Sequence, residues 1–308
     1  MWLAASDGPQ GRSRETRQAH DLDPPDRCER ESTMTVIAMT REIGSRGMEV
    51  AGGVAARLGL KIIRSEIVAD SVAERLGIEP STFLRYMEGS ASLFERWRIN
   101  RRRLVHYAAE EILRVAQQGN VLIKGWGAAT LLRDLPQVIS VRVCAPMEFR
   151  VRVLMGRLGS ADAKAVREEI ERHDAIRVRT MSTYFNVEHE DARLYHVVLN
   201  TERLAIEACV KTVVQLAESP RFRGPMTLRS ALADKLLETM IGSAMAEEIS
   251  PTMAPLGVSV SVANGRITLR GISSNGALRR KAEVIAHTVA GAFPIDNRIV
   301  SVPSHGRF

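Results

Sequence analysis

The sequence predicts an α/β protein in which a parallel sheet with helices on both faces is followed by a small α+β domain. Between residues 34 and 218, short apolar segments alternate with segments of helical period, which is typical of a parallel sheet covered on both faces. Beyond residue 227 the pattern changes to a helix, two strands of strict alternation, a helix and a strand. Two folded domains are therefore expected, the second of αββαβ order.

The composition is that of an ordinary globular protein. Of the 308 residues, 45% are hydrophobic and 26% are charged, which excludes disorder of the whole chain. The net charge of +7 suits nucleotides, nucleic acid or an anionic membrane surface as partners. The arginines are scattered and not interleaved with aromatic residues, which disfavours nucleic acid. No apolar segment reaches the roughly eighteen residues that a membrane-spanning helix needs.

The cysteines indicate the compartment. Cys28, Cys144 and Cys209 are widely separated and odd in number. This spacing excludes a disulfide framework and a CxxC metal site, and it favours a reducing, cytoplasmic location.

Domain boundaries follow from local composition. Residues 1–33 have no apolar periodicity and are expected to form a disordered N-terminal extension. Met34 directly precedes the first strand, so Met1 and Met34 both stay open as the start of translation. Residues 34–218 form the expected first domain. Two prolines and a glycine predict a linker over 219–226, and residues 227–303 form the second domain.

The strands of the first domain are predicted from short apolar runs bounded by glycine, proline or asparagine. They are residues 36–39, 61–63, 121–123, 138–144 and 196–199. Crossovers between parallel strands are right-handed, so the carboxyl ends of these strands share one edge of the sheet. The loops at Gly44, Gly125 and Asn200 are expected along that edge, where ligands bind in such folds.

The helices of the first domain are predicted from apolar positions at helical spacing and from glycine stops. They cover residues 50–58, 66–76, a segment after Pro80, 104–118, a short segment before Pro136, 146–158, 162–185 and 204–217. In the second domain, helices are expected over 228–245 and 276–289, and strands over 258–262, 267–269 and 298–302. Asn264-Gly265 is the expected hairpin turn between the first two of these strands.

The segment Gly44-Ser45-Arg46-Gly47, between the first strand and the first helix, has the order of a P-loop. Glycines let successive backbone N–H groups turn toward one point, and the amino end of the helix adds partial positive charge, so a phosphate is stabilised there. A complete Walker A motif, GxxxxGK[ST], is absent. The alternative is a glycine-bearing turn without a ligand, which is common in α/β proteins.

Two polar pairs later in the chain have both a ligand-binding and a structural interpretation. Asp174 and Arg177 are three residues apart and share one face of the predicted helix. A surface ion pair between them is the structural alternative. Asn200 and Thr201 follow the last strand and equally suit a helix cap.

Taken in order, these landmarks resemble the cytidylate-kinase-like family of P-loop nucleoside monophosphate kinases. Residues 34–60 are similar to the opening of that family, in which a TxSREfGSGG-type loop replaces the ordinary Walker A motif. The later landmarks are residues 121–127 (VLIKGWG), 141–146 (VRVCAP), 171–177 (ERHDAIR) and 198–204 (VLNTERL). The similarity covers about residues 34–217. Residues 227–303 resemble a BON domain, with its NGxIxLxG-type strand.

The resemblance implies ATP and Mg²⁺ as cofactors and assigns three groups of residues. The catalytic residues of the closing lid are Arg150, Arg157, Arg172, Asp174 and Arg177. The cofactor-binding residues are Gly44, Ser45, Arg46, Gly47, Met48, Glu49, Asn200 and Thr201, the last two bordering the base. The acceptor-binding residues are Lys124, Gly125, Trp126 and Arg133.

Three departures from the family pattern bear on activity. Met48 follows the second glycine, where members often have a basic residue, and Arg46 precedes that glycine. Gly125-Trp126 replaces Gly-Arg, and tryptophan stacks on bases but does not pair with phosphate, so Lys124 or Arg133 is expected to compensate in part. Glu49 stands in place of a hydroxyl and is expected to bind Mg²⁺ through its carboxylate.

The resemblance therefore implies a kinase that transfers the γ-phosphate of ATP to a CMP-like nucleoside monophosphate. The alternative is a catalytically degenerate, nucleotide-binding regulatory protein that signals through its BON-like domain. Because BON domains resemble phospholipid- or ligand-binding modules, a lipid or small ligand is the expected partner of the second domain.

Overall fold

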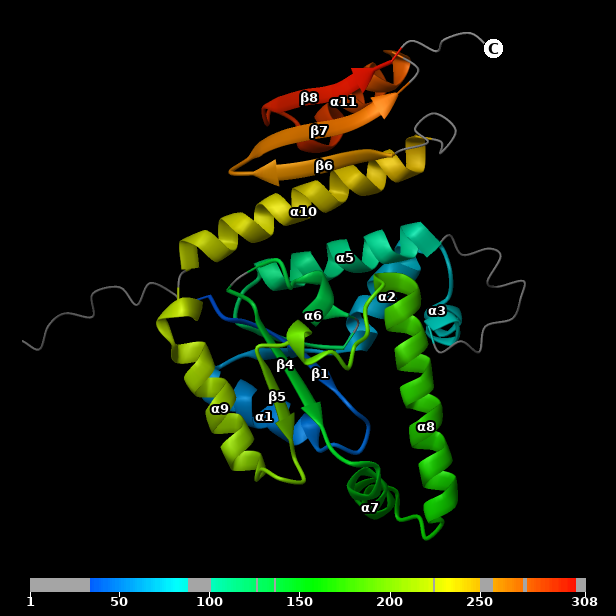
Figure 1. The fold of residues 1–308 in the computed structure, drawn as a ribbon, viewed down its shortest axis with the longest axis vertical. Helices are drawn as coiled ribbons and strands as arrows, with labels where there is room; N and C mark the ends of the chain where they lie inside the picture. Colours follow the sequence, from blue (N-terminus) through cyan, green and yellow to red (C-terminus); the bar gives the residue numbers. More distant parts are fainter. Residues whose placement is uncertain are drawn as a thin grey trace, which may run out of the picture. The chain divides into compact units, whose positions relative to one another are not determined.

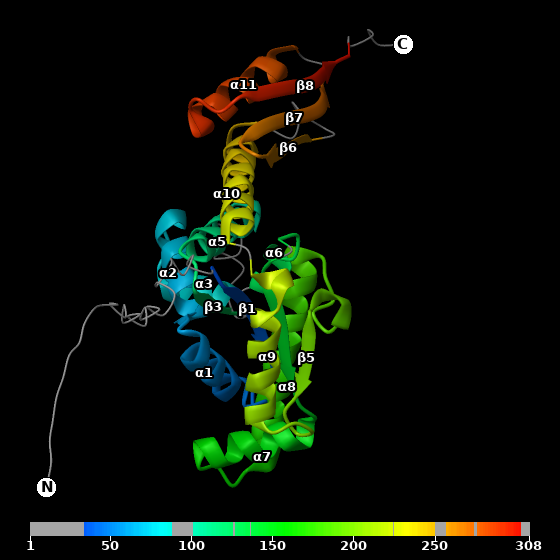
Figure 2. The same cartoon turned by 90° about the vertical axis from the view of Figure 1, so that its left-hand side faces the viewer.

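The computed structural model describes residues 34–87, 101–125, 127–135, 137–223, 225–249, 257–273 and 276–302. Figures 1 and 2 show these residues in two views. The expected disorder of residues 1–33 and the predicted role of Trp126 lie outside the described residues.

A five-stranded, wholly parallel sheet forms the centre of the first domain, as predicted. The strands lie in the order β2-β3-β1-β4-β5. They are β1 (Val36–Arg41), β2 (Lys61–Ile63), β3 (Val121–Lys124), β4 (Ile139–Cys144) and β5 (Val197–Asn200). Since all strands run in one direction, their carboxyl ends meet at one edge, and the loops at Gly44, Gly125 and Asn200 leave the sheet there.

Each face of the sheet has its own apolar core. Ile37 and Met39 of β1 point into the core formed with α1 (Gly47–Leu58) and α9 (Ile206–Glu218), which contact each other. Val36 and Ala38 point to the opposite core, with α2 (Ser65–Leu76) and α5 (Arg101–Gln117). Figure 2 shows α1 and α9 side by side. This two-sided burial explains the continuous apolar runs of the strands.

The remaining helices of the first domain connect the strands. They are α3 (Pro80–Met87), α6 (Ala128–Leu131), α7 (Met147–Leu158) and α8 (Ala163–Thr180). The long helix predicted over 162–185 is α8 followed by one π-helical turn, Met181–Phe185. The side chain of Asp162 caps α8 by accepting a hydrogen bond from the Ala165 N–H at 2.9 Å.

The second domain has the predicted αββαβ order. It consists of α10 (Pro225–Glu248), β6 (Val258–Ala263), β7 (Arg266–Ser273), α11 (Gly276–Ala290) and β8 (Ile295–Ser301). β6 and β7 are antiparallel, and β7 and β8 are parallel. Asn264 and Gly265 both have positive φ, 50° and 71°, as a type I′ hairpin turn requires. The Asp234 carboxylate accepts hydrogen bonds from both of their N–H groups.

α10 contributes side chains to the cores of both domains. Leu228 and Leu232, near its amino end, belong to the core that contains α5. Ile241 and Met245, in its carboxyl-terminal half, belong to the core beneath β6, β7 and β8. The helix starts at Pro225, inside the segment predicted as a linker. No helix in the described ranges is long and apolar enough to cross a membrane.

Leu232 tests whether α10 is part of the first core. Leu232 is fully buried, at 0% exposure, and we expect Leu232→Ala to lower the free energy of unfolding by about 2–5 kcal/mol, because the deletion leaves a cavity. Arg229→Ala, at an exposed position of the same helix, is the control and should change it by less than about 0.5 kcal/mol. Equal denaturation midpoints for the two variants would show that α10 does not stabilise the first core.

Candidate functional site

The loop between β1 and α1 adopts a conformation that its close neighbours dictate. Gly44 has φ of 77°, and a Cβ there would lie 2.6 Å from the carbonyl oxygen of Arg150. Arg46, the residue before α1, has φ of 54°, a left-handed conformation that non-glycine residues rarely adopt. A Cβ on Gly47 would lie 2.8 Å from the Cβ of Arg41. The loop thus packs against α7 on one side and against the Arg41 side chain on the other.

A cavity of about 180 Å³ lies beside this loop, at the amino end of α1. It is lined by Arg41, Gly44, Arg46, Gly47, Met48, Glu49, Val153, Leu154 and Arg157. Three of these residues are arginines, and Glu49 is the one carboxylate among them. The first N–H groups of a helix have no partner within the helix and bear partial positive charge, so the cavity favours an anion.

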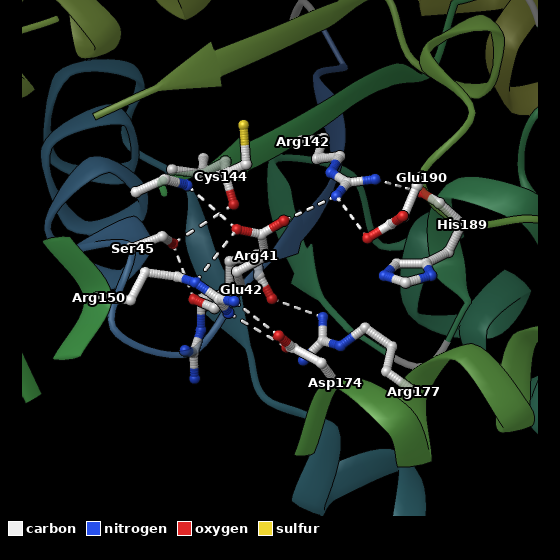
Figure 3. A network of polar contacts seen from close by, with 12 residues as sticks. Arg41, Glu42, Ser45, Arg142, Cys144, Arg150, Asp174, Arg177, His189 and Glu190 are labelled. Atoms are coloured by element: carbon white, nitrogen blue, oxygen red, sulfur yellow. Dashed lines mark hydrogen bonds and ion pairs between the residues drawn. The ribbon is translucent and has the colours of Figure 1, made fainter. Parts of the chain in front are cut away.

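The carboxylate of Glu42, directly after β1, joins three elements around the loop (Figure 3). Its Oε1 accepts a hydrogen bond from Nη2 of Arg142, on β4, at 2.7 Å. Its Oε2 accepts one from the N–H of Ala145 at 3.1 Å and lies 3.7 Å from Nε of Arg150, on α7. The Arg142 and Arg150 side chains are only 8% and 6% exposed, so Glu42 is their buried counter-charge.

Two residues of α8 contact this region, as Figure 3 shows. Asp174 accepts two hydrogen bonds from the Arg150 guanidinium, at 2.7 and 3.2 Å. Arg177 donates to the carbonyl oxygen of Arg41 at 2.5 Å. Asp174 and Arg177 do share one face, as predicted, but Asp174 pairs with Arg150 and the two residues act on different partners. α8 is thereby attached to the end of β1 and to α7.

Positive charge is in excess around the cavity. Burial lowers the pKa of Arg41, and the nearby Arg177 and Arg157 lower it further. Burial also lowers the pKa of Arg177. Within the described part of the chain, the buried Nε atoms of Arg41 and Arg150 have no hydrogen-bond partner. The Arg150 guanidinium is bound to Asp174, whereas Arg41 lines the cavity, so an anion in the cavity would offset the cost of burying Arg41.

Ser45, Asn200 and Thr201 shape the loop and the end of β5. The Ser45 hydroxyl is buried and donates to the carbonyl oxygen of Glu42 at 2.8 Å. The buried Thr201 hydroxyl donates to the Ser45 carbonyl oxygen at 2.8 Å. Asn200 accepts the Glu202 N–H at 3.0 Å, which stabilises a turn. The residue before α9 is Ala205, so the expected helix cap at Asn200 and Thr201 is not what the structure shows.

The predicted residues of the loop and lid fall into two sets. Arg157, Arg46, Met48 and Glu49 line the cavity. Glu49 is ion-paired with Arg46 at 2.5 Å, and this hydrogen bond lowers the pKa of Glu49. Arg172 is exposed and pairs with Glu169 on its own helix at 2.6 Å, so the structure does not bring it to the cavity.

The predicted acceptor residues separate as well. Lys124, at the end of β3, is 9% exposed, and its ammonium donates to the Met48 sulfur at 3.6 Å, beside the loop. Gly125 ends β3 with φ of 83°. Arg133 pairs with Asp134 at 3.7 Å, and Asp134 lines a separate hollow with residues of α10. The structure therefore brings Lys124, but not Arg133, to the loop.

The sequence interpretation missed Arg41, Glu42 and Arg142 as site residues. A signal was present for each. Arg41 and Glu42 are the first polar residues after the apolar run of β1, at the ligand-binding edge of the sheet. Arg142 is a charge inside the otherwise apolar strand β4, and a charged residue is rarely buried without a partner.

The described residues include no group of three or more His, Cys, Asp or Glu side chains suited to a metal ion. Glu49, the predicted Mg²⁺ ligand, is the one carboxylate among the residues that line the cavity.

Comparisons with known proteins cover both domains. The model of the cytidylate kinase-like family matches residues 36–203, and the BON domain model matches residues 233–303. The cytidylate kinase of Pyrobaculum aerophilum is 27% identical over 178 residues, covering 58% of this chain and 90% of that protein. The cytidylate kinase of Aeropyrum pernix is 29% identical over 181 residues, covering 59% of this chain and 96% of that protein.

Among solved structures, an uncharacterized protein from Eubacterium ventriosum superposes with a TM-score of 0.48 at 18% identity, covering 60% of this chain and 99% of that one. The shikimate kinase of Bacteroides thetaiotaomicron superposes with a TM-score of 0.38 at 15% identity, covering 60% of this chain and 99% of that one.

Glu42 and Glu49 provide a matched test of the buried network. We expect Glu42→Gln to lower the free energy of unfolding by about 2–3 kcal/mol, because buried Arg142 loses its charge-assisted hydrogen bond and buried Arg150 loses one of two nearby carboxylates. Glu49→Gln breaks an exposed pair in the same loop and should cost less than about 1 kcal/mol. Urea denaturation of both variants measures the difference, and a smaller loss for Glu42→Gln than for Glu49→Gln would contradict the assignment.

Gly44 and Gly52 test the loop conformation. Gly44→Ala places a methyl group against the Arg150 carbonyl at a positive φ, so we expect a loss of stability of about 1–3 kcal/mol. Gly52, inside α1, has no atom within 4 Å of its Cβ position, and Gly52→Ala should raise stability by about 0.5–1 kcal/mol. Thermal unfolding should shift in opposite directions for the two variants. A Gly44→Ala protein as stable as the wild type would argue against the packed loop.

Proposed function

This chain belongs to the cytidylate kinase-like family, and we propose on that premise that it transfers the γ-phosphate of ATP to a CMP-like nucleoside monophosphate. The matched residues run from the start of β1 to just beyond β5, so they include the whole parallel sheet and its carboxyl edge. The cytidylate kinases of Pyrobaculum aerophilum and Aeropyrum pernix are similar over the same domain.

The observation that carries the proposal is the cavity beside the glycine loop. It combines the amino end of α1 with Arg41, Arg46 and Arg157. Phosphoryl transfer requires little covalent chemistry from a protein, and it depends on positioning and on stabilising negative charge. Glycine N–H groups and guanidinium groups are suited to both tasks.

The proposed roles follow from these contacts. The loop from Gly44 to Gly47 binds the donor phosphates, and Arg41 and Arg157 stabilise the charge on the transferred phosphoryl group. Arg150 and Arg177 are positioning residues, because Arg150 is bound to Asp174 and Arg177 is bound to the Arg41 carbonyl. The acceptor monophosphate binds at the carboxyl end of β3, near Gly125, and Asn200 and Thr201, at the end of β5, border the donor base.

In this proposal the loop also binds Mg²⁺, the cofactor that the family implies. Mg²⁺ in such sites is usually bound by one or two protein carboxylates together with phosphate oxygens and water. Glu49 supplies one carboxylate on the cavity wall, provided that its ion pair with Arg46 exchanges. Bound there, the ion would neutralise part of the phosphate charge.

A second candidate function is a nucleotide-binding regulatory protein with no transferase activity. The favouring observation is α10, which contributes Leu232 to the core of the kinase-like domain and Ile241 to the core of the BON domain. A change in one domain could reach the other through this helix. In this case the nucleotide would control the binding of a lipid or small ligand to the BON domain.

A nucleotide panel tests both candidates. Thermal unfolding is measured with ATP and with CMP, UMP, AMP and GMP, each with Mg²⁺, and transfer is followed in a coupled assay. We expect ATP and CMP each to raise stability, by about 2.7 kcal/mol at a hundredfold excess over the dissociation constant, and CMP to be phosphorylated. Gly44→Ala should lose both effects, whereas Gly52→Ala should keep them.

The outcomes separate the candidates. Stabilisation by ATP without turnover of any monophosphate would refute the kinase and support the regulatory protein. A change in the rate at which a protease cleaves the BON domain when ATP is added would then identify the transmitted signal. Absence of any response to ATP would refute both.

A further inference from the structure

Lys124 is a buried lysine whose ammonium forms no ion pair within the described part of the chain. The residue is 9% exposed, and its ammonium donates a hydrogen bond to the thioether sulfur of Met48 at 3.6 Å. Thioether sulfur is a weak acceptor, so this contact offsets little of the cost of burying the charge. Burial lowers the pKa of Lys124, and Arg41 and Arg64 lower it further while Glu66 opposes them.

The register of the sheet explains why these cations meet. Lys124 is opposite Met39 on β1, and Arg41 follows two residues later, on the same face. On the other side, Ile63 of β2 is opposite Ile123, so Arg64, in extended conformation, continues the row beside Lys124. Met39 belongs to the core that α1 covers. Arg64, Lys124 and Arg41 therefore form one row at the carboxyl edge, on the face of α1.

Met48 connects this row to the cavity. It is the second residue of α1, directly after Gly47, and its side chain lines the cavity. A P-loop of the usual type has a lysine next to this glycine, and here the position is apolar. The Lys124 ammonium reaches the same side chain from the neighbouring strand. Both lysine and methionine have long, unbranched side chains, so exchange of this weak contact for a phosphate oxygen needs only rotamer changes.

We propose that Lys124 is the phosphate-binding cation of the loop, supplied from β3 in place of a lysine at position 48. Its partner in the cavity is the phosphate chain of the donor nucleotide, not the acceptor monophosphate. This inference rests on the proposed phosphate-binding role of the loop. Lys124 replaces its contact with Met48 by a charge-assisted hydrogen bond to a phosphate oxygen when the donor binds.

The test moves the lysine from position 124 to position 48. Binding of tripolyphosphate and of ATP to the full chain is measured by calorimetry for the wild type, Lys124→Met, and Lys124→Met combined with Met48→Lys. We expect Lys124→Met to lower the affinity for both anions about 10- to 100-fold, as loss of a hydrogen bond to a charged group does. The double variant should regain most of that affinity. Lys61→Met, at an exposed lysine on β2, is the matched control and should bind as the wild type does.

A second readout separates a binding role from a structural one. Because Lys124→Met replaces a poorly paired buried ammonium by an apolar side chain of similar length, the unliganded variant should unfold at a higher temperature than the wild type. Opposite changes in stability and in anion affinity are the expected signature. Loss of both together would overturn the inference, since Lys124 would then support the fold.

The remaining outcomes keep this inference distinct from the kinase proposal. If the wild type binds tripolyphosphate but not ATP, and Lys124→Met weakens the former, Lys124 retains its assigned role and the kinase proposal fails. If Lys124→Met binds both anions as tightly as the wild type, the inference is overturned and the kinase proposal stands. If the wild type binds neither anion, both are overturned.

Discussion

The site depends on one carboxylate, that of Glu42. Two buried guanidinium groups from different elements, Arg142 and Arg150, converge on it, and it also accepts the backbone N–H of Ala145. Removing such groups from water is unfavourable unless they are paired, so these elements are held in one arrangement. Arg150 in turn binds Asp174 of α8 and places its carbonyl against Gly44. Through Glu42, the position of α8 and the shape of the glycine loop are linked.

A second constraint opposes the first. Glu42 and Asp174 are satisfied by arginines within the network. Arg41, on the cavity wall, and Lys124, beside Met48, have few anionic partners among the described residues. Paired charges fix the geometry of the loop, and poorly paired charges leave a positive potential beside the amino end of α1. Natural proteins retain such an unfavourable excess of charge where function requires it.

The sequence was sufficient to predict the fold because its signals are local. Apolar runs, glycine stops and the Asn264-Gly265 turn identify strands, helices and a hairpin without knowledge of their neighbours. The site was predicted less completely. The glycine loop was found, but the partners of Glu42 come from β4 and α7, about a hundred residues away, and no local pattern pairs them. Arg172 was predicted from the resemblance to the family's lid, and Arg133 as a substitute for the missing arginine. Their pairing with Glu169 and Asp134 depends on which way each side chain faces.

One helix belongs to two cores, and this restricts how the chain can change in length. Each residue of an α-helix advances the chain by about 1.5 Å and turns it by about 100°. Leu236 and Ile241 of α10 face different cores. The number of residues between them therefore fixes the angle about the helix axis between the two apolar stripes. A single inserted residue would turn one stripe away from its core. Among proteins that join these two domains through such a helix, insertions and deletions should therefore be tolerated in the loops but not between the two apolar stripes of α10.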